Sequence, residues 1–402
     1  MLLALAPSSA HNEMTTTPSI IGWAHTPFGR SPEPDVTALL AEVISPALAS
    51  AQIDASDVDA VFVSVYNNGF SPQGFEAALV SVAEPQLATT PATRLENACA
   101  SGSAAMFAAC DFIESGRGRV ALVLGAEKMT AIPSAQAGDV LLSGSLREET
   151  RDLRGGFAGV FAGIAQAYHD RYGDPSDAMA LIAAKNHAHG VSNPFAHMRK
   201  DLGVDFCSSP SDANPLVAAP LRRTDCAPIS DGAAAVVMAS SDVARSAAQR
   251  VRFRGRAQAA DALQLSGRDP LAFAGARRAW DGALAQAGLE PWDLSLIETH
   301  DCFTIAELLQ YEAFGLAEPG RGAALLEAQV TSSTGRLPVN RSGGLKARGH
   351  PIGATGVSMH VMAAMQVTGT AGDMQLPRAD AAAVFNMGGA AVANYASVLE
   401  SW

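Results

Sequence analysis

Two stretches of the chain share the same order of hydrophobic and polar positions. Residues 40–68, LAEVISPALASAQIDASDVDAVFVSVYNN, read as an amphipathic helix, a polar turn and a strand rich in β-branched residues. Residues 273–301, FAGARRAWDGALAQAGLEPWDLSLIETHD, repeat this order, and Asp57 and Asp293 occupy matching turn positions. Apolar residues at helical spacing followed by a short apolar run predict a helix and then a strand. The pattern favours a duplicated unit over chance similarity between alanine-rich helices.

Each copy leads to a helix that starts with small residues. These helices are expected at 99–113 and 349–367, and each is followed by a continuous apolar strand, at 119–127 and 381–392. Strand–helix–strand order with apolar strands is typical of parallel sheets that helices cover on both faces. The sequence therefore predicts a duplicated α/β fold.

The middle of the chain interrupts this pattern. Residues 129–219 are rich in Gly, Ser, Asp and Pro, and contain short helical patterns. We interpret this segment as an insertion packed on the first half. The predicted division of the chain is an N-terminal extension at 1–16 (loosest over 1–13), a first half at 17–128 plus 220–262, the insertion at 129–219, and a second half at 263–402.

Composition narrows the function classes. The 402 residues, 48% hydrophobic and 17% charged, leave room for two core-bearing units, and the net charge of −12 argues against nucleic acid as a partner. No apolar run approaches the roughly 18 residues of a membrane span, and the opening MLLALA lacks the basic region of a signal peptide. Five cysteines, an odd count without CxxC spacing, predict a reducing cytoplasmic environment.

Reactive side chains stand at the starts of the two small-residue helices. A helix N-terminus lowers the pKa of a thiol, so Cys99 is expected to gain nucleophilicity there. His350, at the equivalent position of the second copy, can accept the Cys99 proton, which is the logic of nucleophilic catalysis. The alternative is that Cys99 is a buried, inert thiol that only fills space, which is the role we expect for Cys110, Cys207 and Cys226.

Two further motifs are expected near the same crevice. ETHDCF (298–303) ends a predicted strand and so places His300 and Cys302 at the carboxyl edge of the sheet. NMGGAA (386–391) follows another strand, where a glycine can turn a backbone N–H into a pocket and form an oxyanion hole. A zinc site made of His300, Cys302 and His350 is the less favoured alternative, because this spacing is unusual for zinc.

Two other groups of residues have alternative interpretations. The metal-like histidines His187, His189 and His197 are expected on a solvated loop face. Seven basic residues in or beside the insertion either attract an anionic ligand or only keep the surface soluble: Arg147, Arg151, Arg154, Arg199, Lys200, Arg222 and Arg223.

The motifs NACASG, HDCF, SGGLKARGHPIGATG and NMGGAA, in this order, resemble the thiolase family. The HDCF motif is similar to that of the sterol-carrier-protein-type thiolases, whose fused lipid-carrier domain is not expected here. The resemblance implies a thiolase-like α/β fold, with duplicated βαβαβαββ halves in a five-layer αβαβα arrangement and an inserted loop domain that holds coenzyme A.

The resemblance also implies roles for individual residues. Cys99 would be the acylated nucleophile, and His350 would activate it and line an oxyanion hole. His300 would belong to that oxyanion hole, and the backbone N–H groups of Gly388 and Cys99 would form a second one. Classical thiolases carry a second cysteine at the position of Asn386, and here Cys302 would replace it as the acid/base. Because neutral Asn386 cannot move a proton, its loss is expected to cost less than the loss of Cys302.

The implied function is that of an acetyl-CoA C-acyltransferase of lipid metabolism. It would cleave 3-oxoacyl-CoA by thiolysis, or run the reverse condensation, through a thioester on Cys99. Coenzyme A and acyl-CoA would be substrates, no metal or other cofactor would be needed, and the chain would form a homodimer or a dimer of dimers. The alternatives are a biosynthetic acyltransferase that works in a complex, and a non-catalytic acyl-CoA-binding subunit, which would be expected to lack Cys99.

Overall fold

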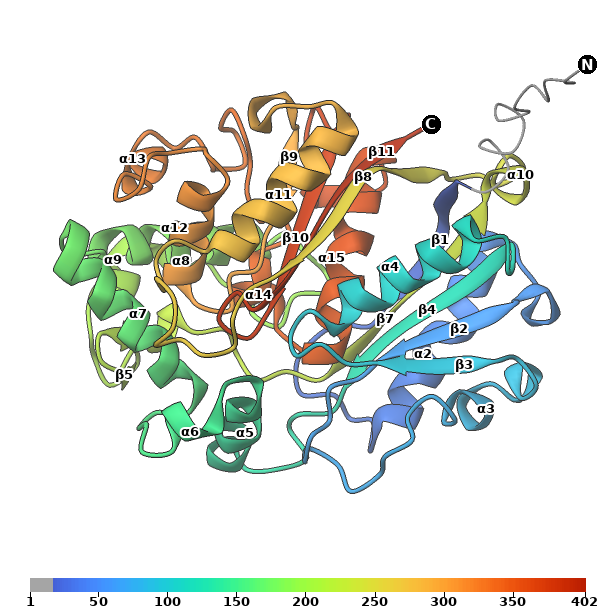
Figure 1. The fold of residues 1–402 in the computed structure, drawn as a ribbon, viewed down its shortest axis with the longest axis horizontal. Helices are drawn as coiled ribbons and strands as arrows, with labels where there is room; N and C mark the ends of the chain where they lie inside the picture. The colour runs from blue at the N-terminus through green and yellow to red at the C-terminus, as the bar shows by residue number, and fades with distance from the viewer. Residues whose placement is uncertain (1–16) are drawn as a thin grey trace, which may run out of the picture.

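A nine-stranded mixed sheet runs through the computed structural model, which describes residues 17–402 (Figure 1). The predicted N-terminal extension, 1–16, lies outside the described residues. The strand order is β3-β2-β4-β7-β1-β8-β11-β10-β9. The strands are β1 (Pro18–His25), β2 (Ala60–Ser64), β3 (Ala92–Leu95), β4 (Val120–Glu127), β7 (Gly232–Ser240), β8 (Val251–Ala260), β9 (Leu296–Glu298), β10 (Ala382–Gly388) and β11 (Ala393–Ser401).

The strands follow the predicted parallel arrangement only in part. β2 is parallel to both β3 and β4, and β9 is parallel to β10. The remaining pairs are antiparallel, because β10 and β11 form a hairpin and because the chain returns from the insertion through β7 in the opposite direction. β8 pairs along its length with β11 but only through Val251 and Arg252 with β1, so it joins the two groups of strands.

The duplicated pattern of the sequence is confirmed. The first copy forms α2 (Val36–Ala51) and then β2, and the second forms α11 (Ala274–Ala287) and then β9. The two small-residue helices are α4 (Ser101–Glu114) and α15 (Ile352–Val367), which lead to β4 and β10.

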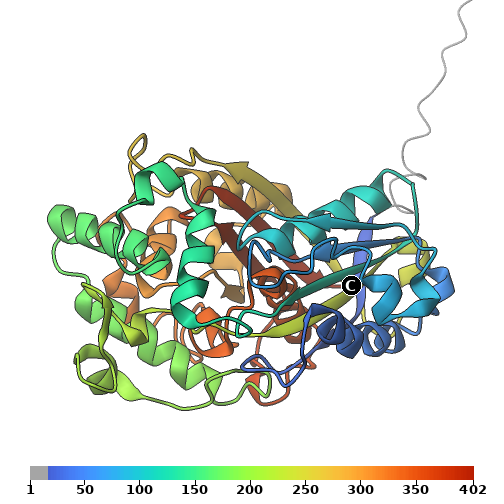
Figure 2. The same ribbon diagram turned by 90° about the horizontal axis from the view of Figure 1, so that it is seen from below.

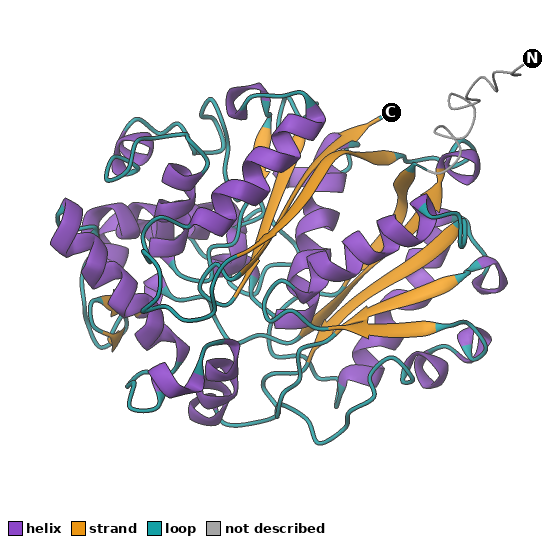
Figure 3. Ribbon diagram, viewed as in Figure 1, coloured by secondary structure: helices purple, strands orange, loops and turns teal. Residues whose placement is uncertain are grey.

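These helices produce the predicted five layers. α2 packs on β1, β4 and β7, and α11 packs on β8 and β11. α4 and α15 lie between the two groups of strands, and α15 contacts strands of both (Figures 1 and 3). β4 is buried along its whole length, as expected for a continuous apolar strand covered on both faces.

The insertion packs on both halves of the chain, whereas the sequence predicted contact with the first half. The contact with the first half includes the hydroxyl groups of Tyr66 and Ser143, 2.6 Å apart, and the insertion also packs on the second half. Its helices α7 and α8 contact α12, and α8 also contacts α14, as Figures 1 and 2 show for the green and orange segments. The physical reason is a buried polar contact and an aromatic stack: Lys185 pairs with Glu307, and Phe161 stacks on Phe303 with ring centroids 4.5 Å apart.

The remaining elements lie mostly in the insertion and in the loops. They are α3 (Val80–Ala83), α5 (Ser134–Leu141), α6 (Arg147–Thr150), α7 (Phe157–Tyr172), α8 (Ser176–Gly190), α9 (Gly203–Ser208), β5 (Leu216–Ala218), β6 (Leu221–Arg222), α10 (Ser241–Ala244), α12 (Thr304–Ala313), α13 (Ala323–Glu327) and α14 (Gly344–Arg348). Over residues 17–402, no helix combines the length and the apolar character that crossing a membrane requires.

Candidate active site

Cys99 and His350 occupy equivalent places in the two copies. Cys99 comes one residue before Ala100, the N-cap of α4, and His350 comes one residue before Pro351, the N-cap of α15. The sequence prediction that both residues stand at helix starts is therefore confirmed.

Two glycines let these helix starts meet. A Cβ atom on Gly102 of α4 would lie 2.6 Å from the backbone nitrogen of Val357 in α15. A Cβ atom on Gly356 of α15 would lie 2.3 Å from the backbone nitrogen of Ser103 in α4. Real Cβ atoms do not approach backbone this closely, so the helices cross in backbone contact only because both residues are glycine.

The crossing brings three reactive groups together from distant parts of the chain. The sulfur of Cys99 and one ring nitrogen each of His300 and His350 lie within 4.8 Å of one another. The two imidazole rings stand edge to face, with centroids 5.1 Å apart and an interplanar angle of 85°. This spacing is also short enough for all three atoms to bind one metal ion. A zinc site here would consist of Cys99, His300 and His350, with Cys99 in place of the Cys302 that the sequence suggested.

A cavity of about 270 Å³ opens beside these groups, and we call it the Cys99 cavity. Among residues 17–402, no Asp, Glu, Lys or Arg side chain contributes to its lining. It is lined by Cys99, Met129, Ser134, Gly138, Leu141, Gly155, Phe157, Ala158, Val217, Cys226, Ala227, Pro228, Ile229, Cys302, Phe303 and His350. The cavity suits an uncharged, apolar ligand with one reactive end.

Hydrogen bonds define the proton position on His350. The hydroxyl of Thr355 donates to the carbonyl oxygen of Pro351 at 2.8 Å, and Nδ1 of His350 lies 2.7 Å from the same hydroxyl oxygen. Because that hydroxyl has given its only proton away, Nδ1 must carry a hydrogen and donate it. Burial and the nearby Arg348 charge lower the pKa of His350 to about 3, so Nε2 is a free lone pair that can accept a proton.

His300 is bound by Asn386. The side-chain nitrogen Nδ2 of Asn386 lies 2.8 Å from Nδ1 of His300 and donates to the carbonyl oxygen of Cys99 at 3.0 Å. Nε2 of His300 has no hydrogen-bond partner among residues 17–402. Burial, together with the neighbouring His350 and Arg348, lowers the pKa of His300 well below its ordinary value.

The thiol of Cys99 does not have the lowered pKa that its place near a helix start predicts. Burial raises its pKa to about 12, although the backbone N–H groups of Gly389 and of Cys99 itself point at the sulfur and act in the opposite direction. Loss of water therefore outweighs the field of the helix end. The resting nucleophile is a neutral thiol, and it needs a base such as His350 to become reactive.

Two backbone N–H groups face the sulfur of Cys99 in the free protein. They belong to Cys99 and to Gly389, whereas the resemblance implied Gly388. Gly389 has a φ of 63°, which favours glycine, and a Cβ atom there would lie 2.8 Å from the carbonyl oxygen of Gly144. Gly388 is packed against the backbone of Asn97, where a Cβ atom would lie 2.3 Å from the carbonyl oxygen.

Cys302 lines the same cavity as Cys99. Burial and the neighbouring Cys99 and Asp301 raise the pKa of Cys302 well above its ordinary value. Its backbone carbonyl accepts a hydrogen bond of 2.9 Å from Ala227, which joins the HDCF segment to the strand-like segment after the insertion. Cys302 is thus a fixed, protonated thiol at the cavity wall.

Two buried carboxylates that the sequence analysis did not single out hold the site together. Asp301 accepts hydrogen bonds from the backbone of Leu345 at 2.6 Å and of Lys346 at 3.2 Å, and so ties the HDCF segment to the segment before His350. Glu127 accepts hydrogen bonds from the backbone of Tyr66 and Gly353, at 2.8 and 3.0 Å. Burial raises the pKa of Glu127 to about 7. An acid at the end of an entirely apolar strand is the signal that could have identified Glu127.

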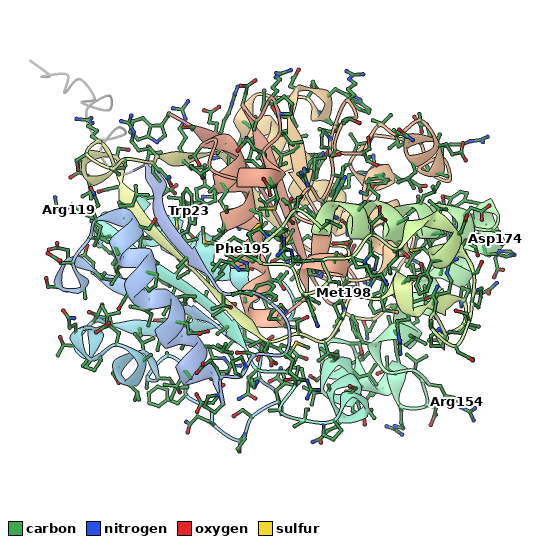
Figure 4. The ribbon with its side chains drawn as sticks, turned by 180° about the vertical axis from the view of Figure 1, so that it is seen from behind. Trp23, Arg119, Arg154, Asp174, Phe195 and Met198 are labelled. Atoms are coloured by element: carbon green, nitrogen blue, oxygen red, sulfur yellow. The ribbon has the colours of Figure 1, made fainter. Side chains whose placement is uncertain are left out.

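Two histidines and one arginine that the sequence placed at the surface are buried. His187 and His189 are buried, contrary to the expected solvated face, and Nδ1 of His189 lies 3.0 Å from the carbonyl oxygen of Asn340. Arg222 is buried against Asp225 and is not available to a ligand. The exposed basic candidates are Arg147, Arg151, Arg154, Arg199, Lys200 and Arg223. Figure 4 shows Arg154 projecting outward at the edge of the molecule.

Both halves of the chain match sequence families of known proteins. Residues 19–206 match the family described as "Thiolase, N-terminal domain", and residues 257–401 match "Thiolase C-terminal domain-like". The chain belongs to the thiolase family.

Individual relatives agree with this assignment. The chain is 33% identical to the acetyl-CoA acetyltransferase of Methanothermobacter thermautotrophicus over 374 residues, which cover 92% of this chain and 96% of the relative. It is 31% identical to human sterol carrier protein 2 over 92% of this chain and 69% of the relative.

Solved structures share the thiolase fold at lower sequence identity. The Ltp2-ChsH2(DUF35) aldolase superposes with a TM-score of 0.80 at 20% identity, covering 96% of this chain and 98% of that one. A monomeric SCP2-thiolase like protein from Mycobacterium smegmatis superposes with a TM-score of 0.73 at 20% identity, covering 96% of this chain and 77% of that one.

Proposed function

We propose that this thiolase is an acetyl-CoA C-acyltransferase that works through a thioester on Cys99. The observation that carries the proposal is the cluster of Cys99, His300 and His350, whose reactive atoms lie within 4.8 Å of one another at an uncharged cavity. A nucleophile, a neutral base and a second imidazole in one buried site are the groups that acyl transfer requires.

In the cleavage direction, the sulfur of Cys99 adds to the C3 carbonyl of a 3-oxoacyl-CoA while its proton moves to Nε2 of His350. The backbone N–H groups of Cys99 and Gly389 receive the negative charge on the C3 oxygen, because both already point at the sulfur. The C2–C3 bond then breaks, which leaves the acyl group on Cys99 and releases the enolate of acetyl-CoA.

The enolate takes a proton from the Cys302 thiol to give acetyl-CoA, and His300 stabilises the enolate oxygen while it exists. The thiol of a free coenzyme A next attacks the acyl group and gives its proton to the Cys302 thiolate. The Cys99 thiolate that leaves takes its own proton back from Nε2 of His350. Condensation of an acyl-Cys99 with acetyl-CoA is the reverse of these steps, and Cys302 then removes the proton from the α-carbon.

The walls of the Cys99 cavity indicate the class of acyl group. Met129, Leu141, Phe157 and Ile229 contribute apolar surface, and the described lining holds no Lys or Arg that could pair with a carboxylate. An acyl group with a second acid function would lose its hydration there without a cationic partner, at a cost of several kcal/mol. The proposed substrates therefore carry neutral, apolar acyl groups.

Coenzyme A is proposed to enter through a second hollow of about 420 Å³. This hollow shares Gly155 and Val217 with the Cys99 cavity and is bordered by the exposed side chain of Arg154. Arg147 and Arg151 lie on the same stretch of the insertion and are exposed as well. In a chain with a net charge of −12, such a group of arginines is suited to the phosphates of coenzyme A.

The decisive experiment is to incubate the protein with acetyl-CoA and map the adduct by peptide mass spectrometry. An acetyl group on Cys99 that is absent from Cys99→Ala supports the proposal. Cys110→Ala is the matched control, because Cys110 lies on α4, the helix that begins just after Cys99, is fully buried and does not line the cavity.

Other results would contradict the proposal. Binding of acetyl-CoA without an adduct would favour a non-catalytic acyl-CoA-binding subunit. An adduct whose transfer to a second substrate needs a co-purifying protein would favour a biosynthetic acyltransferase working in a complex. Loss of acylation after dialysis against a chelator, with recovery on adding Zn²⁺, would favour the metal alternative.

A further inference from the structure

We propose that Asn386 is a positioning residue that places a proton on Nε2 of His300, where it can bind the enolate oxygen. This inference rests on the proposed function, because it concerns the step in which the enolate forms. It gives a role to the residue that stands where classical thiolases carry a second cysteine.

The argument starts from the amide of Asn386. A backbone carbonyl can only accept, so the atom that contacts the Cys99 carbonyl oxygen at 3.0 Å must be the nitrogen Nδ2 rather than Oδ1. The same nitrogen lies 2.8 Å from Nδ1 of His300. Nδ2 carries two hydrogens and no available lone pair, so it donates one to each neighbour.

It follows that Nδ1 of His300 accepts and carries no hydrogen. A neutral imidazole has one N–H, and the ring is neutral because its burial lowers its pKa well below the ordinary value. The hydrogen of His300 is therefore on Nε2, which is the ring nitrogen without a partner among residues 17–402. A buried N–H without a partner is a donor prepared for a group that arrives with the substrate.

The two histidines thus carry their protons at opposite ends. His350 holds its hydrogen on Nδ1, against Thr355, and leaves Nε2 as an acceptor. His300 accepts at Nδ1 and leaves Nε2 as a donor. One ring can take the proton of Cys99 while the other stabilises an oxygen anion, although both are neutral histidines in the same cluster.

The surroundings of Asn386 keep the amide in this orientation. If the amide turned over, Oδ1 would face both the Cys99 carbonyl oxygen and Nδ1 of His300, so at least one contact would join two acceptors. Oδ1 lies instead toward α15, where a Cβ atom on Gly356 would be 2.5 Å away. In the described chain, Asn386 is the hydrogen-bond partner of Nδ1 of His300 and Nε2 has none, so the proton position depends on Asn386.

The test is the substitution Asn386→Asp, which keeps the shape of the side chain and reverses the direction of the hydrogen bond. A carboxylate cannot donate, so Nδ1 of His300 would take the hydrogen and Nε2 would lose it. We expect deuterium exchange into the methyl group of acetyl-CoA to fall about 100- to 1,000-fold near pH 8, the usual effect of losing one oxyanion donor. Acylation of Cys99 should change far less.

The pH profile separates this role from a merely structural one. In Asn386→Asp the new carboxylate lies beside Nδ1 of His300. As the pH falls, Nε2 takes up a proton as well and becomes a donor again, so the exchange rate of this variant should recover relative to wild type. In Asn386→Ala either ring nitrogen of His300 can carry the hydrogen, and we expect a loss of only about twofold, because about half of the rings or more keep the hydrogen on Nε2.

Asn394→Asp is the matched control, since Asn394 is also a fully buried asparagine in the C-terminal hairpin and its Nδ2 donates only to backbone carbonyls. It should show no recovery at low pH. Equal exchange in wild type and Asn386→Asp at all pH values would overturn the inference, whereas absence of an acetyl adduct in wild type would overturn the proposed function.

A measurement on the wild-type protein does not depend on activity or on the folding of a variant. Long-range ¹H–¹⁵N NMR spectra of histidine-labelled protein distinguish the two neutral forms, and His300→Ala identifies the His300 signals. A hydrogen on Nε2 is the expected result. A hydrogen on Nδ1 would refute the inference.

Discussion

The hydroxyl of Thr355 accepts a hydrogen bond of 2.7 Å from Nδ1 of His350. The same hydroxyl donates to the carbonyl of Pro351 at 2.8 Å, so its direction is fixed and with it the free lone pair of His350. This contact lies in the first turn of α15, so the start of the helix holds the imidazole ring of His350 in one orientation.

Replacing Thr355 with valine should slow the acylation of Cys99 while leaving the KM for acetyl-CoA nearly unchanged. Valine keeps the shape and removes the acceptor, and the loss of one hydrogen bond of about 1 kcal/mol corresponds to roughly a five- to tenfold slower reaction. Single-turnover acylation followed by mass spectrometry measures the rate. Thr355→Ser keeps the hydroxyl and should react like wild type, and a rate equally low in both variants would contradict the prediction.

Cys302→Ala should still accept an acetyl group on Cys99 but lose the carbon–carbon step. The loss should be about two to four orders of magnitude, because a positioned acid/base contributes about this much. Deuterium exchange into the methyl group of acetyl-CoA reports on that step. Cys226→Ala removes the third thiol of the cavity and serves as control. Exchange at the wild-type rate in Cys302→Ala would point to one of the two histidines as the base.

Glu127 should make the folded protein less stable as the pH rises. Its pKa is about 7 in the fold and 4.5 as the ordinary value, so the folded state holds the proton more tightly. The contribution of Glu127 to the free energy of unfolding is fully present below pH 4.5. It is lost as the pH rises toward 7, and the loss is on the order of 3 kcal/mol. Thermal unfolding of wild type and Glu127→Gln across this range measures the effect as a difference. A constant difference between the two proteins would contradict the prediction.

Arg154→Ala should weaken the binding of coenzyme A esters. We expect the KM for acetyl-CoA to rise about three- to tenfold, the usual range for one charge-assisted contact at a surface. A pantetheine thioester without the nucleotide phosphates should be unaffected. Arg119→Ala is the control, because Arg119 is exposed at the opposite end of the molecule (Figure 4). Equal changes for both thioesters would show that Arg154 acts other than through the phosphates.

The protein is expected to dimerise through its first half. β3 is the edge of the sheet, with β2 on one side and no strand on the other in the described part of the chain. Nearby, Phe75 is 79% exposed and has a φ of 59°, an unusual conformation for an aromatic residue on a free surface. Analytical ultracentrifugation at micromolar concentration should show a dimer, and Phe75→Asp should weaken it. A monomeric wild type would refute this expectation.

Much of the fold could be predicted from the hydrophobic pattern, because an outer helix such as α2 buries one face and a central strand such as β4 is a continuous apolar run. In α2, for example, the apolar spacing of Leu39, Leu40, Val43 and Ile44 gives the buried side directly. The equivalence of the two copies predicted that Cys99 and His350 would meet, and the position of His300 after a predicted strand placed it near the same crevice.

The remainder depends on contacts that no local pattern records. His187 and His189 lie in a run of polar residues that reads as a surface, yet α8 is held in the interior by partners more than one hundred residues away, such as Asn340 and Glu307. The raised pKa of Cys99 depends on how much water the folded chain excludes, and the sequence around the thiol carries no measure of that.

The meeting point of α4 and α15 has a consequence for how such an enzyme can change over generations. Gly102 and Gly356 leave no room for even one methyl group, so the separation of the two helix starts that carry nucleophile and base is set by main-chain contact. Half of the residues that line the cavity, by contrast, come from the insertion, such as Leu141 and Phe157. New substrates can therefore be acquired by altering the walls, while the machinery that breaks and forms the bond stays as it is.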